Sequence, residues 1–228
     1  MPQPIKIVGG GVVQPGVEAA IDPLFQAARF SARPIDYTNL GQNLGHYALV
    51  ATTSAALWSA NAILFAFRWT DPSRFSVIQS LSVGATVVTA VTAQRVDPVV
   101  ATIARSYTVR DLTNATVVTM SGNNQKQSTK MGTSLIGNID VASAAAGLTG
   151  GTKTLDANSI GFSSMPGLLG LGTAVANTVV LDPNTGDGEH PIILAANEGL
   201  VVSWGPTALA TGTATVTVKV RWAEAIQF

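Results

Sequence analysis

The chain has 228 residues, enough for one large β domain or two small ones, and a fold of that size buries a substantial core without cross-links. It contains no cysteine, so disulfides, thiolate metal sites and a cysteine nucleophile are excluded. Charged residues make up only 11% of the chain, against about 25% in an average protein, and the thirteen of each sign cancel. A neutral chain lacks the basic face of a nucleic-acid binder.

Low charge also favours association, because little repulsion keeps two copies of such a chain apart. Hydrophobic residues make up 46% of the chain, yet no apolar run approaches the roughly 18 residues that span a bilayer, and the first residues lack the pattern of a signal peptide. We therefore expect a soluble protein whose surface is covered in part by copies of itself or by a partner. An ordinary soluble surface of Thr, Ser, Asn and Gln is the alternative.

Residues 1–40 are predicted to form an extended N-terminal arm, since glycine and proline interrupt every apolar stretch before residue 17. Asp22 and Pro23 suit the start of a short helix over residues 24–30, and a strand over residues 27–32 is compatible with the same letters. Such an arm lies either on a neighbouring subunit or along the edge of its own domain. Arg29 and Arg33 are its candidates for partner binding.

Residues 41–228 are predicted to form a single β domain. The clearest signal is AILFAFRWT (62–70), in which Phe65, Phe67 and Trp69 alternate with Arg68 and smaller apolar residues, as in a strand beneath a core. A second stretch, ATVTVKVRW (214–222), repeats the design and also ends in Arg-Trp. Further strands are expected over residues 46–53, 76–83, 86–92, 99–110 and 116–120.

Weaker patterns predict how these strands connect. Gly84 is expected to mark a bulge or break, and Asp97-Pro98 a strand boundary. Residues 121–178 are expected to form long surface loops or an insertion that orders on a partner, with short strands at 134–141 and 152–155. Residues 191–204 are predicted to form a hairpin that turns at Glu198-Gly199. No long amphipathic helix separates the strands, which leaves an antiparallel sandwich.

The sequence gives no reason to expect an enzyme. Gly9-Gly10-Gly11 lacks the spacing of a phosphate loop, and no Gly-x-Ser-x-Gly elbow occurs. His46 and His190 have no second ligand at metal spacing. The segment from Asp182 to Glu189 offers several oxygen ligands but departs from an EF-hand loop, and a solvated turn explains it better than calcium does. We therefore expect no cofactor and no resident metal.

Two further side chains are candidates for contact with a partner. Trp58 lies in a predicted loop over residues 54–61 and is the best candidate for an exposed aromatic, because interfaces and sugar-binding surfaces favour tryptophan. Arg68, like Arg221, stands beside a tryptophan, where it either completes the edge of the core or contacts a subunit.

Seven segments in one order resemble a group of largely uncharacterised tailed-bacteriophage proteins. They are SARP (31–34), LGHYALVATT (44–53), FAFRW (65–69), GNNQKQSTKMGTSL (122–135), GTKTLDANSI (151–160), LAANEGLVV (194–202) and VRWAE (220–224). These motifs mark a lineage and are not a catalytic signature, so the resemblance implies no active-site residue. The last two segments, with their neighbours, are also similar to the final strands of jelly-roll domains in trimeric virion and receptor-binding proteins.

The patterns and the resemblance predict an all-β, jelly-roll-like antiparallel sandwich with an extended N-terminal arm. The resemblance implies a non-enzymatic structural component of a phage virion. It would be a homo-oligomer, with a trimer favoured, that decorates or cements the major capsid protein or joins the neck or tail proteins. Neither nucleic acid nor membrane is expected as a partner. A receptor- or glycan-binding head of a tail fibre is the first alternative, and a polysaccharide-degrading enzyme, disfavoured by the few carboxylates, is the second.

Overall fold

A computed structural model describes residues 45–92, 96–120, 125–127, 131–166, 174–181 and 192–225. The chain divides after Thr38, and all of these residues belong to the unit Asn39–Phe228. The predictions for the N-terminal arm, for Arg29 and Arg33, and for the segment from Asp182 to His190 therefore lie outside the described residues.

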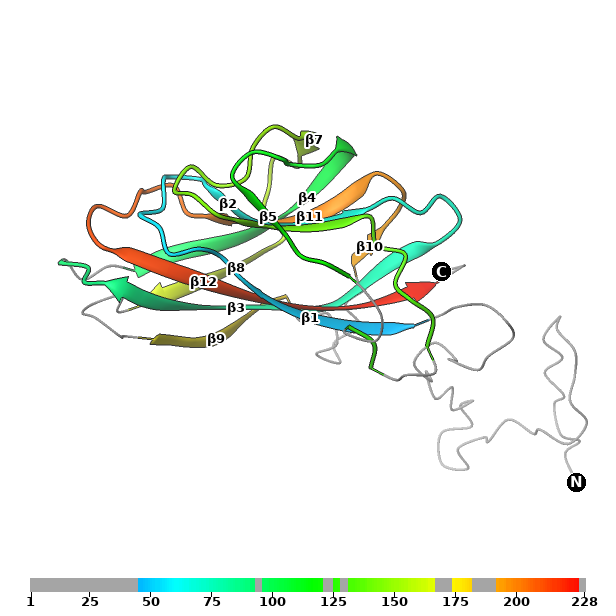
Figure 1. Cartoon of the computed structure of the whole chain (residues 1–228), viewed down its shortest axis with the longest axis horizontal. Coiled ribbons are helices and arrows are strands. Elements are labelled where there is room, and N and C mark those ends of the chain that lie inside the picture. The colour runs from blue at the N-terminus through cyan, green and yellow to red at the C-terminus, as the bar shows by residue number, and fades with distance from the viewer. Residues whose placement is uncertain are drawn as a thin grey trace, which may run out of the picture. The chain divides into compact units, whose positions relative to one another are not determined.

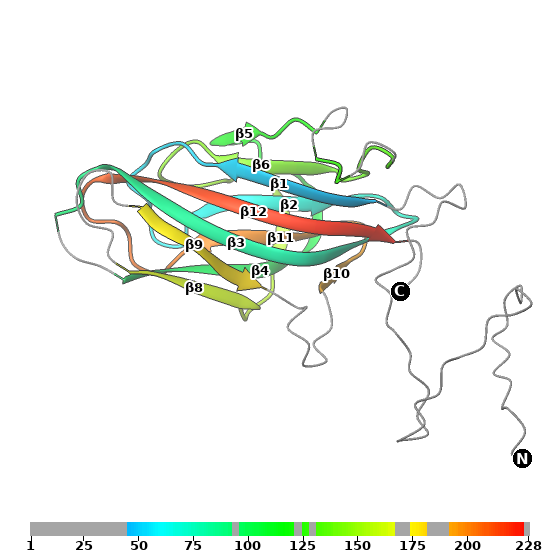
Figure 2. The same cartoon turned by 90° about the horizontal axis from the view of Figure 1, so that it is seen from below.

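The described residues contain no helix and form two antiparallel sheets packed face to face, which confirms the predicted all-β sandwich (Figures 1 and 2). Sheet one runs β1 (His46–Thr52), β12 (Thr213–Ala225), β3 (Phe75–Thr89), and successive parts of β3 then pair with β9 (Ala174–Leu181) and β10 (Ile192–Leu194). Sheet two has the order β5 (Ala115–Val117), β6 (Asn138–Ala142), β2 (Ile63–Trp69), β11 (Glu198–Trp204) and β4 (Val96–Val109). The first half of β4 then pairs with β8 (Gly161–Pro166), and its second half pairs with β7 (Thr152–Leu155).

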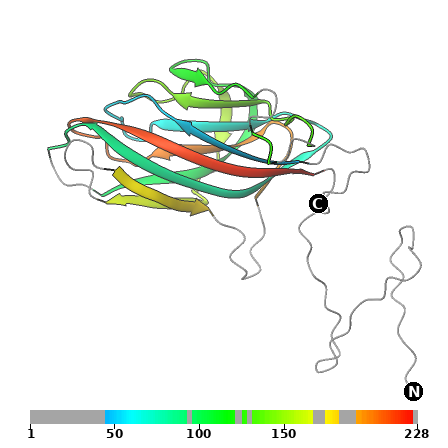
Figure 3. The ribbon, with the colours of Figure 1, turned by 60° about the horizontal axis from the view of Figure 1, so that its bottom comes forward.

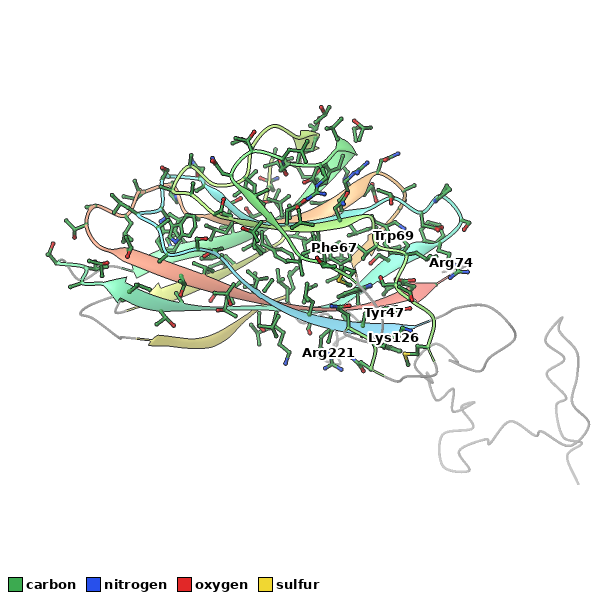
Figure 4. All side chains as sticks on the ribbon, viewed as in Figure 1. Tyr47, Phe67, Trp69, Arg74, Lys126 and Arg221 are labelled. Atoms are coloured by element: carbon green, nitrogen blue, oxygen red, sulfur yellow. The ribbon has the colours of Figure 1, made fainter. Side chains whose placement is uncertain are left out.

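The two strands that contain the Arg-Trp pairs, β2 and β12, belong to different sheets and face each other across the core. Trp222 of β12 meets Phe67 of β2 edge to face, with ring centroids 5.3 Å apart, and stacks on Tyr47 of β1 at 5.4 Å. Figure 4 shows Tyr47, Phe67 and Trp69 between the two layers. All four tryptophans of the chain are fully buried, and each removes about 150–250 Å² from water, so they contribute a large share of the core.

The longest ladder joins β3 and β12, which pair from Thr213 with Thr89 to Ala225 with Phe75. Along β12, Val216, Val218 and Val220 are fully buried and the residues between them are half-buried or exposed, as a strand over a core requires. The register shifts between Arg221 and Trp222, which leaves Gln79 of β3 as the extra residue of a bulge.

The predicted strands over residues 76–83 and 86–92 form the single strand β3, which ends at Thr89, so the break expected at Gly84 does not occur. The bulge expected there is confirmed on the side of β9, since that register shifts between Val83 and Ala85. Asp97-Pro98 lies inside β4 instead of at its boundary. Proline lacks a backbone N–H, and it fits at this position because Pro98 pairs only with β8. Pairing with β11 begins one residue later, at Val99, so no hydrogen bond to β11 requires a donor at Pro98.

The predicted hairpin over residues 191–204 is also wrong. Strand β10 pairs with β3 in sheet one, whereas β11 pairs with β2 and β4 in sheet two. The turn between them, with Asn197 at φ 62°, therefore carries the chain from one sheet to the other. The predicted loop region likewise contains β8 and the start of β9, which the weak pattern did not indicate.

Residues 105–115 and 143–155, which we call the covering layer, lie over the outer side of the central strands β2 and β11 of sheet two (Figure 1). The layer includes the end of β4 and all of β7, the edge strand of the same sheet. Ala66 and Val201 point to that side and are nevertheless buried. Small residues make this possible: a Cβ atom on Gly199 would lie 2.8 Å from the ring of Tyr107, so that ring rests directly on the sheet. Paired hydrogen bonds between Thr113 and Thr149 join the two parts of the layer.

Candidate functional site

Trp58 is not an exposed contact residue, so that prediction is wrong. The side chain is fully buried, and its indole N–H donates a hydrogen bond of 2.8 Å to the carbonyl oxygen of Ala214. The loop itself was predicted correctly, since it connects β1 to β2. This connection crosses from sheet one to sheet two and carries the tryptophan into the core, where the Ala214 carbonyl satisfies its polar atom.

Arg68 is held within the chain. Its Nε and Nη2 donate to the carbonyl oxygens of Tyr107 and Thr108, both at 2.6 Å, and Nη1 donates to Asn138 Oδ1 at 3.3 Å. The guanidinium carbon also lies 5.8 Å from the centroid of the Tyr107 ring. The geometry therefore matches the core-edge alternative: Arg68 fastens the covering layer to sheet two.

The densest polar cluster in the described residues lies in the covering layer, around Asp111. Lys153 Nζ donates to both carboxylate oxygens of Asp111, at 2.6 and 2.7 Å, and the Tyr107 hydroxyl donates to Oδ2 at 2.5 Å. The backbone N–H of Gly151 donates to Oδ1 at 3.1 Å. Asp111 is fully buried and the Lys153 side chain is 8% exposed, so this ion pair is shielded from water.

Backbone geometry explains how Asp111 and Tyr107 reach this position. Ser106 has a φ of 49°, a left-handed conformation that a non-glycine residue adopts at a cost, and the pairing of β4 with β7 shifts between Arg105 and Val109. The chain therefore leaves the ladder at this point and turns over the outer side of sheet two. Burial raises the pKa of the Tyr107 hydroxyl, and its hydrogen bond to Asp111 raises it further, so the hydroxyl stays a donor.

A second buried pair lies beside the first. Arg110 Nη2 donates to Asp140 Oδ1 at 2.5 Å, and Asp140 is 1% exposed. Burial raises the pKa of Asp140 above its ordinary value, while the hydrogen bond and charge of Arg110 act in the opposite direction. Because Asp140 belongs to β6 and Arg110 to the covering layer, this pair also fastens the layer to the sheet.

A third group of charges lies at the surface. Arg105 forms a salt bridge with Asp156 at 3.3 Å and a shorter one with Glu198, and its side chain is 44% exposed. Hydrogen bonds to both carboxylates raise the pKa of Arg105. Exposed pairs of this kind add little to stability, typically below about 1 kcal/mol.

Glu224 is the buried acid of sheet one. Its Oε1 accepts hydrogen bonds from the Ser134 hydroxyl at 2.5 Å and the Leu135 N–H at 3.0 Å, which holds the segment before β6 against the end of β12. Burial raises the pKa of Glu224, and both hydrogen bonds oppose that rise. Its Oε2 has no hydrogen-bond partner among the described residues. The Trp222 indole N–H is near enough to favour the charged form of Glu224, but it does not meet the geometry of a hydrogen bond.

The outer side of sheet one, which we call the open face, differs from all of these clusters (Figure 3). Threonines pair across its strands, with hydroxyl distances of 2.9 Å from Thr52 to Thr217 and from Thr213 to Thr89. Val50 and Val179 project from it and are 60% and 59% exposed.

Charge on the open face is sparse and of one sign. The described parts of its strands carry two cations on this side, Lys219 and Arg221, and Arg221 points away from the core in Figure 4. The acidic residue of these strands, Glu224, faces inward. This side is therefore a broad surface of hydroxyl and methyl groups, suited to contact with another protein surface.

Metal ligands do not gather in the described part of the chain, where no group of three or more His, Asp or Glu side chains is arranged to hold an ion. His46 Nδ1 lies 3.1 Å from Gln79 Oε1, and burial lowers the pKa of this histidine. No helix in the described residues is long and apolar enough to cross a membrane.

Sequence reasoning missed both the Asp111 cluster and the open face. Asp111 lies about 40 residues before Gly151 and Lys153 in the sequence, and only the fold brings it next to them. The open face does have a signal in the sequence: Thr215, Thr217, Lys219 and Arg221 alternate with the buried valines of β12 and include no acidic residue. No protein-family model and no curated protein matches the chain.

Proposed function

We propose that the chain is a non-enzymatic structural component of a tailed bacteriophage particle, a homo-oligomer that decorates or cements the capsid or forms part of the neck. A trimer is the favoured state. The resemblance of the seven segments supports the phage assignment, and their positions include β1, β2, the crossing from β10 to β11, and the end of β12.

The open face is the observation that carries this proposal. Interfaces between subunits are depleted in charge at their centre, and the described part of this surface presents threonines and valines with two cations, Lys219 and Arg221. The central strands of sheet two, in contrast, already have their outer side covered by the chain, since Ala66 and Val201 are buried there, whereas Phe162 of the edge strand β8 is 68% exposed. A protein with one largely covered sheet and one exposed sheet of low charge suits packing against neighbouring subunits.

Strand order supports the jelly-roll part of the proposal. The order β1, β12, β3, β9 in sheet one faces the order β2, β11, β4, β8 in sheet two, and consecutive strands repeatedly cross between the sheets. This order matches the eight-strand winding of a double-sheet jelly roll and so supports that assignment, with β10 as an addition to sheet one and β5, β6 and β7 as additions to sheet two.

Matched variants of the full chain test the proposal. Val50→Glu places a charge on the open face, and Leu112→Glu places one at an equally exposed apolar position of the covering layer, the two side chains being 60% and 65% exposed. Light scattering at two protein concentrations should give a discrete oligomer for the native chain and for Leu112→Glu, and a smaller species for Val50→Glu. A native monomer, or equal behaviour of the two variants, would contradict the proposed oligomer.

Detection in particles tests the location separately. Mass spectrometry of gradient-purified particles of the phage that encodes the chain should find it at a fixed ratio to the major capsid protein. Its absence from particles would contradict the virion assignment even for a stable oligomer. The receptor-binding alternative drew its support from Trp58, whose burial removes that support.

A further inference from the structure

Asp111 and Lys153 have an arrangement that goes beyond an ordinary ion pair. Lys153 Nζ is within 2.7 Å of both carboxylate oxygens, so the nitrogen also lies against the carboxyl carbon between them. The carboxylate is fully buried and the lysine nearly so. A reacting pair held at contact distance in a dry site loses the entropic barrier that separates amines and carboxylic acids in water.

We propose that Lys153 and Asp111 join in an intramolecular amide bond that the folded chain forms by itself. The product is an isopeptide cross-link between Lys153 Nζ and Asp111 Cγ. It would fasten β7 covalently to the segment that follows β4, and so lock the covering layer across residues 111–153.

The reaction balances without any co-reactant. One proton passes from the ammonium group of Lys153 to the Asp111 carboxylate, which gives a neutral amine and a neutral carboxylic acid. The amine nitrogen then attacks Cγ, the Nζ–Cγ bond forms, and the bond from Cγ to Oδ2 breaks. Oδ2 leaves as water with the transferred proton and a second proton from Nζ, so the chain loses one water molecule and no electrons move.

A third contact fixes the position of the attacking nitrogen. The contact between the Lys153 ammonium and the Tyr107 ring, 4.9 Å from Nζ to the centroid, keeps the nitrogen in place while the pair is charged.

Two neighbours are placed to act on the two oxygens. The Gly151 N–H donates to Oδ1, the oxygen that stays in the amide, and stabilises the negative charge that develops there during attack. The Tyr107 hydroxyl donates to Oδ2, the leaving oxygen, and Lys153 Nζ donates to the same oxygen, so the hydroxyl is placed to assist the transfer of a proton to Oδ2 as its bond to Cγ breaks. A Cβ atom at position 151 would lie 2.6 Å from Oδ1, so glycine is needed for this approach.

Intact mass of the denatured full chain is the test. The native protein should be 18 Da lighter than its sequence, after allowance for the initiator methionine. Lys153→Arg should have its full sequence mass, since the guanidinium does not attack, whereas Lys219→Arg on the open face should keep the 18 Da deficit. A native chain at its full sequence mass would overturn the proposal.

Peptide mapping separates the cross-link from a cyclic imide, which also removes water. The native digest should contain one branched peptide that joins Asp111 to Lys153, absent from Lys153→Arg. A deficit that persists in Lys153→Arg, or that maps elsewhere, also overturns the proposal.

In chains sampled at intervals after cell-free synthesis, Tyr107→Phe should acquire the deficit at least tenfold more slowly than the native chain. An unchanged rate would refute the role of the Tyr107 hydroxyl in proton transfer.

Discussion

The outer sides of the two sheets differ in exposure and in charge. The central strands of sheet two are covered by residues 105–115 and 143–155. Several charged side chains in or beside this covering layer form ion pairs within the chain. Sheet one is exposed, with threonine pairs, valines and two cations. The difference teaches that a chain with few charges uses many of them for internal attachment and leaves its open sheet available for protein contact.

Loss of Asp111 should break this contrast most severely. Asp111→Ala leaves the Lys153 ammonium buried without its anion, which costs about 3–5 kcal/mol, and it also prevents the proposed cross-link, so this figure is the minimum expected loss. Urea unfolding of the full chain should show that decrease in the free energy of unfolding. As a control, Asp156→Ala removes an exposed partner of Arg105 and should cost less than about 1 kcal/mol. Equal losses would contradict the assignment of the Asp111 cluster as the main attachment.

Much of the fold was predictable, because burial on one side of a strand imposes a two-residue period. Residues 62–70 and 214–222 showed that period and became β2 and β12, whose inner side chains meet across the core. The period cannot reveal which strands pair. The stretches around β10 and β11 satisfied a hairpin pattern, and their assignment to different sheets depends on partners far away in sequence.

The candidate site was less predictable than the fold. Trp58 was placed in a loop correctly, but a loop that crosses between sheets can point its tryptophan inward, and local sequence does not record that direction. The Asp111 cluster depends on the left-handed backbone at Ser106 and on contacts across 42 residues, neither of which has a local pattern.

A methyl group beneath the covering layer should have the next largest effect. In Gly199→Ala the new Cβ would lie 2.4 Å from the carbonyl oxygen of Phe67 and 2.8 Å from the Tyr107 ring, so the layer must shift, at a cost of about 1–3 kcal/mol. Gly84→Ala is the matched change on the open side of β3 and should alter stability by less than about 1 kcal/mol. Thermal unfolding of both variants measures the difference, and equal shifts would show that Tyr107 can be displaced freely.

The buried acid of sheet one should give a smaller effect that depends on pH. Burial raises the pKa of Glu224 above its ordinary value of 4.5, so the folded chain binds a proton more readily than the unfolded chain does. The native protein therefore gains stability as the pH falls through the raised pKa, and loses it as the pH rises.

Glu224→Gln removes this dependence. The amide oxygen can still accept the hydrogen bonds of Ser134 and Leu135, but no charge is buried at neutral pH. The variant should be more stable than the native chain at pH 7, and the difference should shrink toward acidic pH. Urea unfolding at a series of pH values measures it. A constant difference would mean that Glu224 has the same pKa in the folded and unfolded chains.

The smallest effect is expected on the open face, where the threonine pairs are exposed to water. The hydroxyls of Thr52 and Thr217 are 2.9 Å apart on neighbouring strands, and such cross-strand pairs contribute about 0.2–1 kcal/mol. A double-mutant cycle with Thr52→Val and Thr217→Val measures their coupling by chemical unfolding of the full chain. A coupling energy above about 2 kcal/mol would mean that the pair is shielded from water, as it would be inside a subunit interface. The cycle should therefore be repeated at protein concentrations above and below the one at which the oligomer assembles. Because burial strengthens a hydrogen bond, a coupling that grows with assembly would place this pair within the contact between copies.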